Sequence, residues 1–139
     1  MDDQNPAQSL FATVDACAAV GIAVFIVHAR KAWLKGLSPK ENRDVPPLDY
    51  ALVRRLKRER PHLSISINGG IASLDEAEAH LDDADGVRLD GVMLGRAAYH
   101  EPAILGEADR RLFGEDGGDI DAFAALGRYR PYMATRLAE

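Results

Sequence analysis

The sequence predicts an α/β fold in which helices cover a parallel sheet. Segments with apolar residues at helical spacing alternate with three short segments that are apolar almost throughout. Such alternation is typical of strand–helix–strand units with right-handed crossovers, which produce parallel strands. Strands that are apolar throughout are expected to be buried on both faces.

The composition is that of one globular domain. The chain has 139 residues, of which 47% are hydrophobic and 28% are charged. Its longest apolar run, residues 16–27, is too short to cross a bilayer, and the acidic first residues do not resemble a signal peptide. A single cysteine cannot form an internal disulfide. We therefore expect a cytoplasmic protein without a membrane partner.

The first predicted unit is a helix over residues 7–20 followed by a strand over residues 22–27. Gly21 stands where such a helix would have its C-terminal cap. Because Cys17 lies in the apolar stripe of the helix, we expect a buried, unreactive thiol rather than a nucleophile. The stripe consists of Leu10, Val14, Cys17 and Ala18.

The second predicted unit is a helix over about residues 48–59 and a strand over residues 63–67. A long loop that contains three prolines precedes this helix. The apolar residues of the helix fall on one side, and most of its arginines fall on the other. The apolar residues are Leu48, Leu52, Val53 and Leu56.

The third predicted unit begins with Ser73–Glu76, which has the spacing of a capping box and starts a helix to about residue 82. The third strand is predicted over residues 91–94. A repeated Asp-Gly-Val sequence before this strand indicates a short insertion near residues 85–89.

The remaining residues are predicted to be helical with one break. Helices are expected from about residue 97, over residues 102–113 and over residues 120–138. The acidic, glycine-rich sequence of residues 114–119 is typical of a linker.

Charge is distributed unevenly along the chain. Residues 28–62 hold ten Lys or Arg and four Asp or Glu, whereas the other residues hold seven basic and eighteen acidic side chains. A basic tract on an acidic chain indicates contact with a polyanion. The alternative is that several of these cations simply coat one solvated helix face. Those cations are Arg54, Arg55, Lys57, Arg58 and Arg60.

Candidate ligand-binding residues follow each predicted strand. The carboxyl ends of parallel strands meet at one edge of a sheet, which is where ligands bind in such folds. Paired glycines let backbone N–H groups approach a ligand, and a guanidinium beside a helix N-terminus suits a phosphate. These features predict a phosphate site, against the alternatives of ordinary glycine turns and a structural histidine. The residues are His28, then Asn68, Gly69 and Gly70, then Gly95 and Arg96.

Other chemistries find no matching pattern in the sequence. No histidines or cysteines have the spacing of a zinc site, so we expect no metal. No serine nucleophile motif occurs, and the carboxylates near residues 82–90 lack a proton partner. Hydrolysis by these residue types is therefore not predicted.

Three segments of the chain closely resemble the A-type tRNA-dihydrouridine synthases. They are HARKAWLKGLSPKENRDVPPLDY (28–50), LKRERPHLSISINGGI (56–71) and DGVMLGRAAYHEPAIL (90–105). The resemblance extends over about residues 10–138. It implies an oxidoreductase that reduces uridines of tRNA to 5,6-dihydrouridine with FMN, using NADPH as the reductant.

The resemblance also implies roles for individual residues. Trp33 is expected to line an RNA-facing loop, and phosphate contacts there would give affinity and orientation rather than sequence readout. The expected tRNA contacts are Lys40 and Arg43. The expected FMN contacts are His28, Asn68, Gly69, Gly70, Gly95 and Arg96.

The chain departs from the family pattern in its length and in its catalytic acid. A closed (β/α)8 barrel needs at least about 200 residues, whereas three strand–helix units are predicted here. The family's cysteine acid, and its flavin-binding glutamine and lysine, belong to motifs that this sequence does not contain, and Cys17 lies in a helix. We expect residues 1–113 to form an incomplete C-terminal part of a TIM (β/α)8 barrel. Residues 114–139 would then be a linker and the start of a helical domain.

An isolated chain of this kind is expected to be inactive, and marginally stable or self-associating, because a short parallel sheet has two open edges. A missing N-terminal barrel half is the expected partner besides tRNA. Two alternatives remain: a non-catalytic tRNA-binding remnant, and part of another FMN- or phosphate-binding barrel enzyme.

Overall fold

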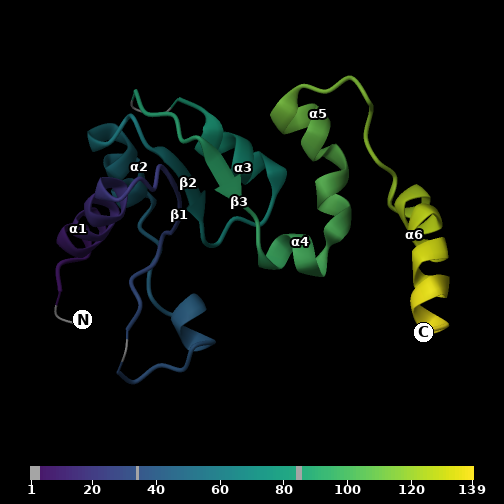
Figure 1. The fold of residues 1–139 in the computed structure, drawn as a ribbon, viewed down its shortest axis with the longest axis horizontal. Coiled ribbons are helices and arrows are strands. Elements are labelled where there is room, and N and C mark those ends of the chain that lie inside the picture. Colours follow the sequence, from purple (N-terminus) through teal and green to yellow (C-terminus); the bar gives the residue numbers. More distant parts are fainter. Residues whose placement is uncertain (1–3, 34, 84–85) are drawn as a thin grey trace. The chain divides into compact units, whose positions relative to one another are not determined.

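The computed structural model describes residues 4–33, 35–83 and 86–139, and it contains a three-stranded parallel sheet. The strands β1 (Val24–His28), β2 (Ser64–Asn68) and β3 (Gly91–Met93) lie side by side in chain order (Figure 1). The predicted α/β fold with a parallel sheet is therefore confirmed. The helices that precede or separate the strands are α1 (Pro6–Ala19), η1 (Glu41–Arg43), α2 (Tyr50–Glu59) and α3 (Leu74–Leu81).

The chain divides into two compact units. The first consists of Met1–Ile71 and Asp75–Gly95, and the second of Ala72–Leu74 and Arg96–Glu139. The three strands belong to the first unit. The second unit contains α4 (Arg96–His100), η2 (Pro102–Glu107), α5 (Ala108–Phe113) and α6 (Ala122–Leu137).

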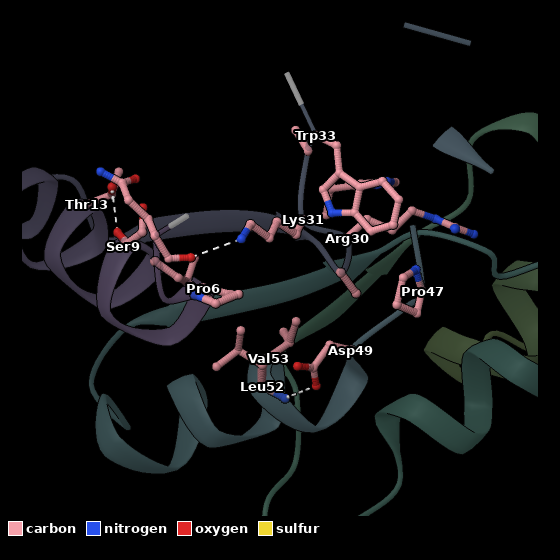
Figure 2. Close-up of a pocket in the computed structure, with 15 residues that line it drawn as sticks. Pro6, Ser9, Thr13, Arg30, Lys31, Trp33, Pro47, Asp49, Leu52 and Val53 are labelled. Atoms are coloured by element: carbon pink, nitrogen blue, oxygen red, sulfur yellow. Dashed lines mark hydrogen bonds between the residues drawn. The ribbon is translucent and has the colours of Figure 1, made fainter. Parts of the chain in front are cut away.

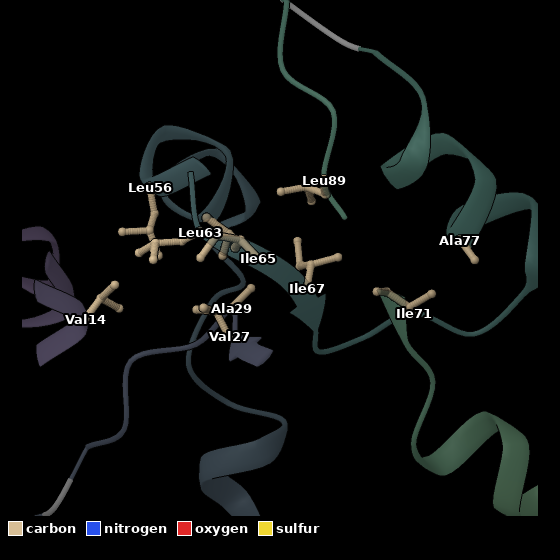
Figure 3. Packing of buried hydrophobic residues seen from close by; sticks show 11 residues of the cluster. Val14, Val27, Ala29, Leu56, Leu63, Ile65, Ile67, Ile71, Ala77 and Leu89 are labelled. Atoms are coloured by element: carbon tan, nitrogen blue, oxygen red, sulfur yellow. The ribbon is translucent and has the colours of Figure 1, made fainter. Parts of the chain in front are cut away.

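Helices cover one face of the sheet and form the core of the first unit with it. Ile65 and Ile67 of β2 are fully buried at the centre of this core. The strands and the segments beside them contribute most of its members, and α1, α2 and α3 contribute the rest (Figure 3). The helical members are Val14 from α1, Val53 and Leu56 from α2, and Ala77 from α3.

None of the described residues packs over the opposite face of the sheet. Val24 and Ile26 of β1 are 65% and 59% exposed, and their register partners on β2 are Ser64 and Ser66. In the described part of the chain the first strand is therefore buried on one face only, contrary to the expectation. Helices α1 to α3 pack on one face only, so alternate residues of β1 point to solvent. The polar–apolar alternation of β2 (SISIN) was the sequence signal for one-sided burial.

The ends of α1 agree with the prediction. Asn5 caps its N-terminus, where the side-chain oxygen accepts hydrogen bonds from Ala7 N and Gln8 N. Gly21 follows the helix with a φ of +96°, and its N–H donates to the Ala18 carbonyl. Cys17 is only half-buried, which corrects the expectation of a buried thiol.

Contrary to the alternative that it coats a solvated helix face, Arg54 is bound to other parts of the protein. It is half-buried, and its guanidinium donates to the carbonyls of Val87, Ala79 and His80 at 3.0, 3.1 and 3.3 Å. It thereby ties α2 both to the end of α3 and to the segment before β3. The predicted insertion near residues 85–89 lies partly outside the described residues, because Asp85 is not among them.

The single helix predicted over residues 102–113 is two elements, the 3-10 helix η2 and the α-helix α5. Gly106 lies within η2, and a Cβ at this position would collide with the Ile120 carbonyl oxygen. Ile120 N in turn donates to the Gly106 carbonyl at 2.8 Å. None of the helices in the described part of the chain combines the length and the apolar character needed to cross a membrane.

Candidate functional site

The carboxyl ends of the three strands are linked by polar contacts. The parallel register pairs His28 with Asn68, and Asn68 with Met93. His28 Nδ1 lies 2.6 Å from Asn68 Oδ1, and Asn68 Nδ2 donates to the Met93 carbonyl at 2.9 Å. The structure thus brings two of the predicted site residues, His28 and Asn68, into direct contact at the solvent-exposed tips of the strands.

Gly69 and Gly70 form a sharp turn directly after β2. Their φ angles are +115° and +75°, a region that residues with a side chain rarely adopt. A Cβ on Gly70 would lie 2.5 Å from Leu48 Cδ1 and 2.9 Å from Tyr50 Oη. Packing against Leu48 and Tyr50 therefore requires glycine here, whether or not a ligand is bound.

Tyr50 holds the peptide between the two glycines. Its hydroxyl donates to the Gly69 carbonyl at 2.7 Å, and its ring contacts the edge of His80 at 4.6 Å between centroids. Burial, reinforced by the negative charge of Glu76, raises the pKa of Tyr50 and keeps the hydroxyl protonated. Since N–H and C=O point in opposite directions in a trans peptide, Gly70 N–H points away from Tyr50.

Tyr50 was not identified as a site residue from its sequence pattern. It ends the segment PPLDY, and nothing in its spacing indicates contact with a turn nineteen residues later.

Gly95 and Arg96 lie at the division between the two compact units. Gly95 ends the first unit, two residues after β3, and Arg96 begins α4 in the second unit. A phosphate site that includes Arg96 therefore stays a prediction.

Several described residues of the basic loop after β1 are joined by hydrogen bonds. Asn42 makes two of them to the Trp33 backbone: Oδ1 accepts from Trp33 N at 2.7 Å, and Nδ2 donates to the Trp33 carbonyl at 2.8 Å. Ser38 N donates to Glu41 Oε2 at 2.7 Å. Hydrogen bonds from the Ser38 hydroxyl, and secondly from this N–H, lower the pKa of Glu41. Lys40 and Arg43 are exposed on the same loop, at and beside η1.

Arg30 anchors the return of this loop. Its Nη1 donates to the carbonyls of Asp44, at 2.9 Å, and Pro46. The Arg30 backbone also forms an antiparallel bridge with Leu48. Leu48 is the residue that packs against the glycine turn, so the basic loop and the turn are structurally connected.

A pocket of about 560 Å³ opens beside the tip of β1 (Figure 2). Trp33 and Arg30 lie on one side of it and Leu52 and Val53 on the other. Lys31 Nζ donates to the Gln4 carbonyl at 3.0 Å across one end. The lining thus combines apolar side chains with two cations that donate to backbone carbonyls and with the carboxylate of Asp49. The remaining lining residues are Pro6, Ser9, Leu10, Thr13, His28, Ala29, Ala32 and Pro47.

The polar groups at the strand tips come from side chains and backbone that do not form a cluster of acidic, histidine and cysteine residues. Among residues 4–33, 35–83 and 86–139, no three histidine, cysteine, aspartate or glutamate side chains come together as metal ligands would. The donors and acceptors at the strand tips are instead an imidazole, an amide and a backbone N–H. Groups of this kind suit the hydroxyl and phosphate oxygens of an organic cofactor.

Comparison with known proteins agrees with the resemblance seen in the sequence. A family model described as dihydrouridine synthase (Dus) matches residues 1–127. The tRNA-dihydrouridine(20/20a) synthase of Escherichia coli (strain K12) is 49% identical over 140 residues, which are 100% of this chain and 39% of that protein. The enzyme of the same name from Haemophilus ducreyi is 54% identical over 115 residues, which are 83% of this chain and 34% of its own.

A third relative, the tRNA-dihydrouridine(20/20a) synthase of Salmonella typhimurium, is 49% identical over 140 residues and is covered to 41%. The chain thus spans about two fifths of the length of the Escherichia coli and Salmonella relatives that it matches.

Proposed function

Because the chain belongs to the dihydrouridine synthase family, we propose that it forms the flavin-binding and RNA-facing part of a tRNA-dihydrouridine synthase of the A-type subfamily. The observation that carries the proposal is the joined set of strand tips, in which the His28–Asn68–Met93 linkage lies beside the Gly69–Gly70 turn. The N–H of Gly70, which points away from Tyr50, and the His28 ring would give a flavin nucleotide a donor and a polar ring to contact.

Each residue of the site has a proposed part in holding FMN. The Gly70 amide would bind the phosphate, and His28 with Asn68 would contact the polyol chain. The family resemblance assigns Gly95 and Arg96 to the same cofactor. Bound FMN, once reduced by NADPH, would supply the hydride for the uracil ring. The chain's own contribution is to bind and orient the cofactor.

The architecture in this proposal is a TIM (β/α)8 barrel. The uncovered sheet face, with its exposed Val24 and Ile26, would face the barrel interior, and other strands would pair with the open edge of β1. Residues 1–113 would belong to the barrel, and residues 114–139 would form a linker and the start of a helical domain. Cys17 lies on α1, before the first strand, and not in a loop that follows a strand. The cysteine that acts as the catalytic acid in the family would therefore come from another barrel half.

The RNA-facing part in this proposal is the loop that carries Lys40 and Arg43. Both side chains are exposed, and the backbone beside them is held by the hydrogen bonds of Asn42 and Ser38. Lysine and arginine in such positions bind phosphates of the RNA backbone. An enzyme with this substrate would act in the cytoplasm.

The RNA contact is tested by filter binding to tRNA over a series of salt concentrations. Changing Lys40 and Arg43 together to alanine is expected to weaken binding and to reduce the slope of log K against log salt by about 2, one unit for each phosphate that is no longer bound. The matched control removes two cations from α2 through Arg55→Ala and Arg58→Ala. An equal loss in the control would place the RNA contact on the helix and contradict the proposal.

The flavin site is tested by fluorescence titration with FMN. We expect weak or no binding and no dihydrouridine formation by this chain alone, and binding once the amino-terminal barrel half of the Escherichia coli relative is added. Binding of tRNA without any flavin binding in the mixture would favour the non-catalytic remnant. Flavin binding without tRNA binding would favour a barrel enzyme that acts on a small molecule.

A further inference from the structure

The imidazole of His28 contacts neighbouring residues through its Nδ1 edge. Nδ1 lies 2.6 Å from Asn68 Oδ1, and Gly69 packs against the same edge of the ring. A Cβ on Gly69 would lie 3.2 Å from His28 Cε1 and 3.3 Å from Nδ1. Within residues 4–33, 35–83 and 86–139, the ring forms no second hydrogen bond, so Nε2 is open to a ligand.

The second contact of Asn68 sets the orientation of its amide. The Met93 carbonyl lies 2.9 Å from Nδ2, and a carbonyl oxygen can only accept a hydrogen bond. The NH₂ group must therefore face Met93, which leaves Oδ1 facing His28. Because Oδ1 is also an acceptor, the proton of the neutral imidazole must be on Nδ1.

A neutral imidazole that is protonated on Nδ1 has a lone pair on Nε2 and accepts a hydrogen bond there. A fully ionised phosphate offers no donor to this nitrogen, whereas a hydroxyl group does. The donor of the neutral His28 ring is therefore used by Asn68.

We propose that Asn68 is a positioning residue that selects the Nδ1–H tautomer of His28, so that Nε2 accepts a hydrogen bond from a hydroxyl group of the bound ligand. The ligand class rests on the proposed function. In FMN the matching groups are the hydroxyls of the ribityl chain, so His28 contacts the polyol and the phosphate is left to the glycine turn.

The tautomer is measured by NMR on the full chain labelled with ¹⁵N-histidine, at a pH at which the rings are neutral. Correlations between the ring nitrogens and the carbon-bound ring protons distinguish the two tautomers. The chain has four histidines, and a His28→Gln variant identifies the signals of this residue. We expect the Nδ1–H pattern for His28, and the Nε2–H pattern would overturn the proposal.

Two variants test whether Asn68 is the cause. Asn68→Ala removes the acceptor, so His28 is expected to lose the Nδ1–H pattern and adopt the Nε2–H form that free histidine prefers. Asn68→Asp keeps an oxygen toward Nδ1 and is expected to keep the Nδ1–H pattern. Unchanged signals of the other three histidines verify folding. Retention of the Nδ1–H pattern in Asn68→Ala would show that Asn68 does not select the tautomer of His28.

The ligand is tested on the same labelled chain in the presence of the added barrel half. Riboflavin, which has the ribityl hydroxyls but no phosphate, is expected to shift the Nε2 signal as FMN does, and inorganic phosphate is expected to leave it unchanged. An equal shift with phosphate would overturn the assignment to the polyol. If neither flavin shifts the signal, the ligand assignment fails together with the proposed function, whereas the tautomer measured without ligand decides the role of Asn68 separately.

Discussion

Replacing Gly70 by alanine is expected to destabilise the protein by about 3 kcal/mol. A residue with a side chain pays about 1–2 kcal/mol in the left-handed region that this position occupies. The new Cβ would also lie 2.5 Å from Leu48 Cδ1 and 2.9 Å from Tyr50 Oη. Forcing such contacts into a packed site costs about 1–3 kcal/mol more, because neighbouring side chains must leave their preferred positions.

The measurement is the free energy of unfolding in urea, with Gly21→Ala as the matched control. Gly21 has a φ of +96°, but a Cβ at this position would have nothing within 4 Å, so alanine there has the backbone cost without the collision. A double variant that adds Leu48→Ala to Gly70→Ala relieves part of the collision and should be less destabilised than the two single changes predict. Equal losses for Gly70→Ala and Gly21→Ala would contradict the packing argument.

The same turn illustrates how far sequence reasoning reached at the candidate site. The apolar segments and the polar residues after them located the strand tips, and parallel register then brings His28 level with Asn68. The reason for the paired glycines was not predictable. It depends on Leu48 and Tyr50, which reach the turn from a segment about twenty residues earlier in the chain.

One-sided burial of the sheet was missed for a related reason. The apolar run before His28 has the composition of a strand covered on both faces, but composition does not reveal how many layers pack around it. The serines of β2 alternate with Ile65 and Ile67, and this period-2 pattern was the better guide to the covered face. Helix boundaries were predictable where a local signal exists, as at Asn5 and Gly21.

The basic tract proves to contain cations of two kinds. Some join distant segments of the chain: Arg54 binds three backbone carbonyls, Lys57 pairs with Asp90, and Arg60 pairs with Asp15. Others, such as Lys40 and Arg43, are exposed on the loop after β1. Charge counting could not separate the two kinds, because the partners of the first kind lie far away in sequence.

Removing the Asp90 carboxylate is also expected to lower the stability of the fold substantially. Asp90 Oδ2 lies 2.8 Å from Lys57 Nζ and accepts a hydrogen bond from Ile65 N at 2.7 Å, so it joins α2 to the start of β2. In Asp90→Ala, the amine of Lys57, whose side chain is 14% exposed, and the Ile65 N–H both lose this partner. We expect a cost of about 2 kcal/mol, near the lower end for a broken charged contact, because the Asp90 side chain is itself 37% exposed and screened by water.

The contribution of Asp90 should depend on pH in a defined direction. Burial alone would raise the pKa of Asp90, but the hydrogen bonds from Lys57 and Ile65 N outweigh it, and the pKa is lowered in the folded protein. The carboxylate therefore stabilises the fold above its unfolded pKa of about 3.9, and this stabilisation is lost as the pH falls through the lower folded value. Urea unfolding from pH 7 down to pH 3 should show a steeper loss of stability in the wild type than in Asp90→Asn.

Asp15→Asn is the control for this experiment, because Asp15 also pairs with a cation, Arg60, at 2.7 Å, but on the protein surface. The Arg60 hydrogen bond lowers the pKa of Asp15 as well, but water screens the pair, so its removal should change the stability at neutral pH little. A smaller loss for Asp90→Asn than for Asp15→Asn would mean that the Ile65 N–H and Lys57 find other partners. In that case the carboxylate would not be what holds the start of β2 to α2.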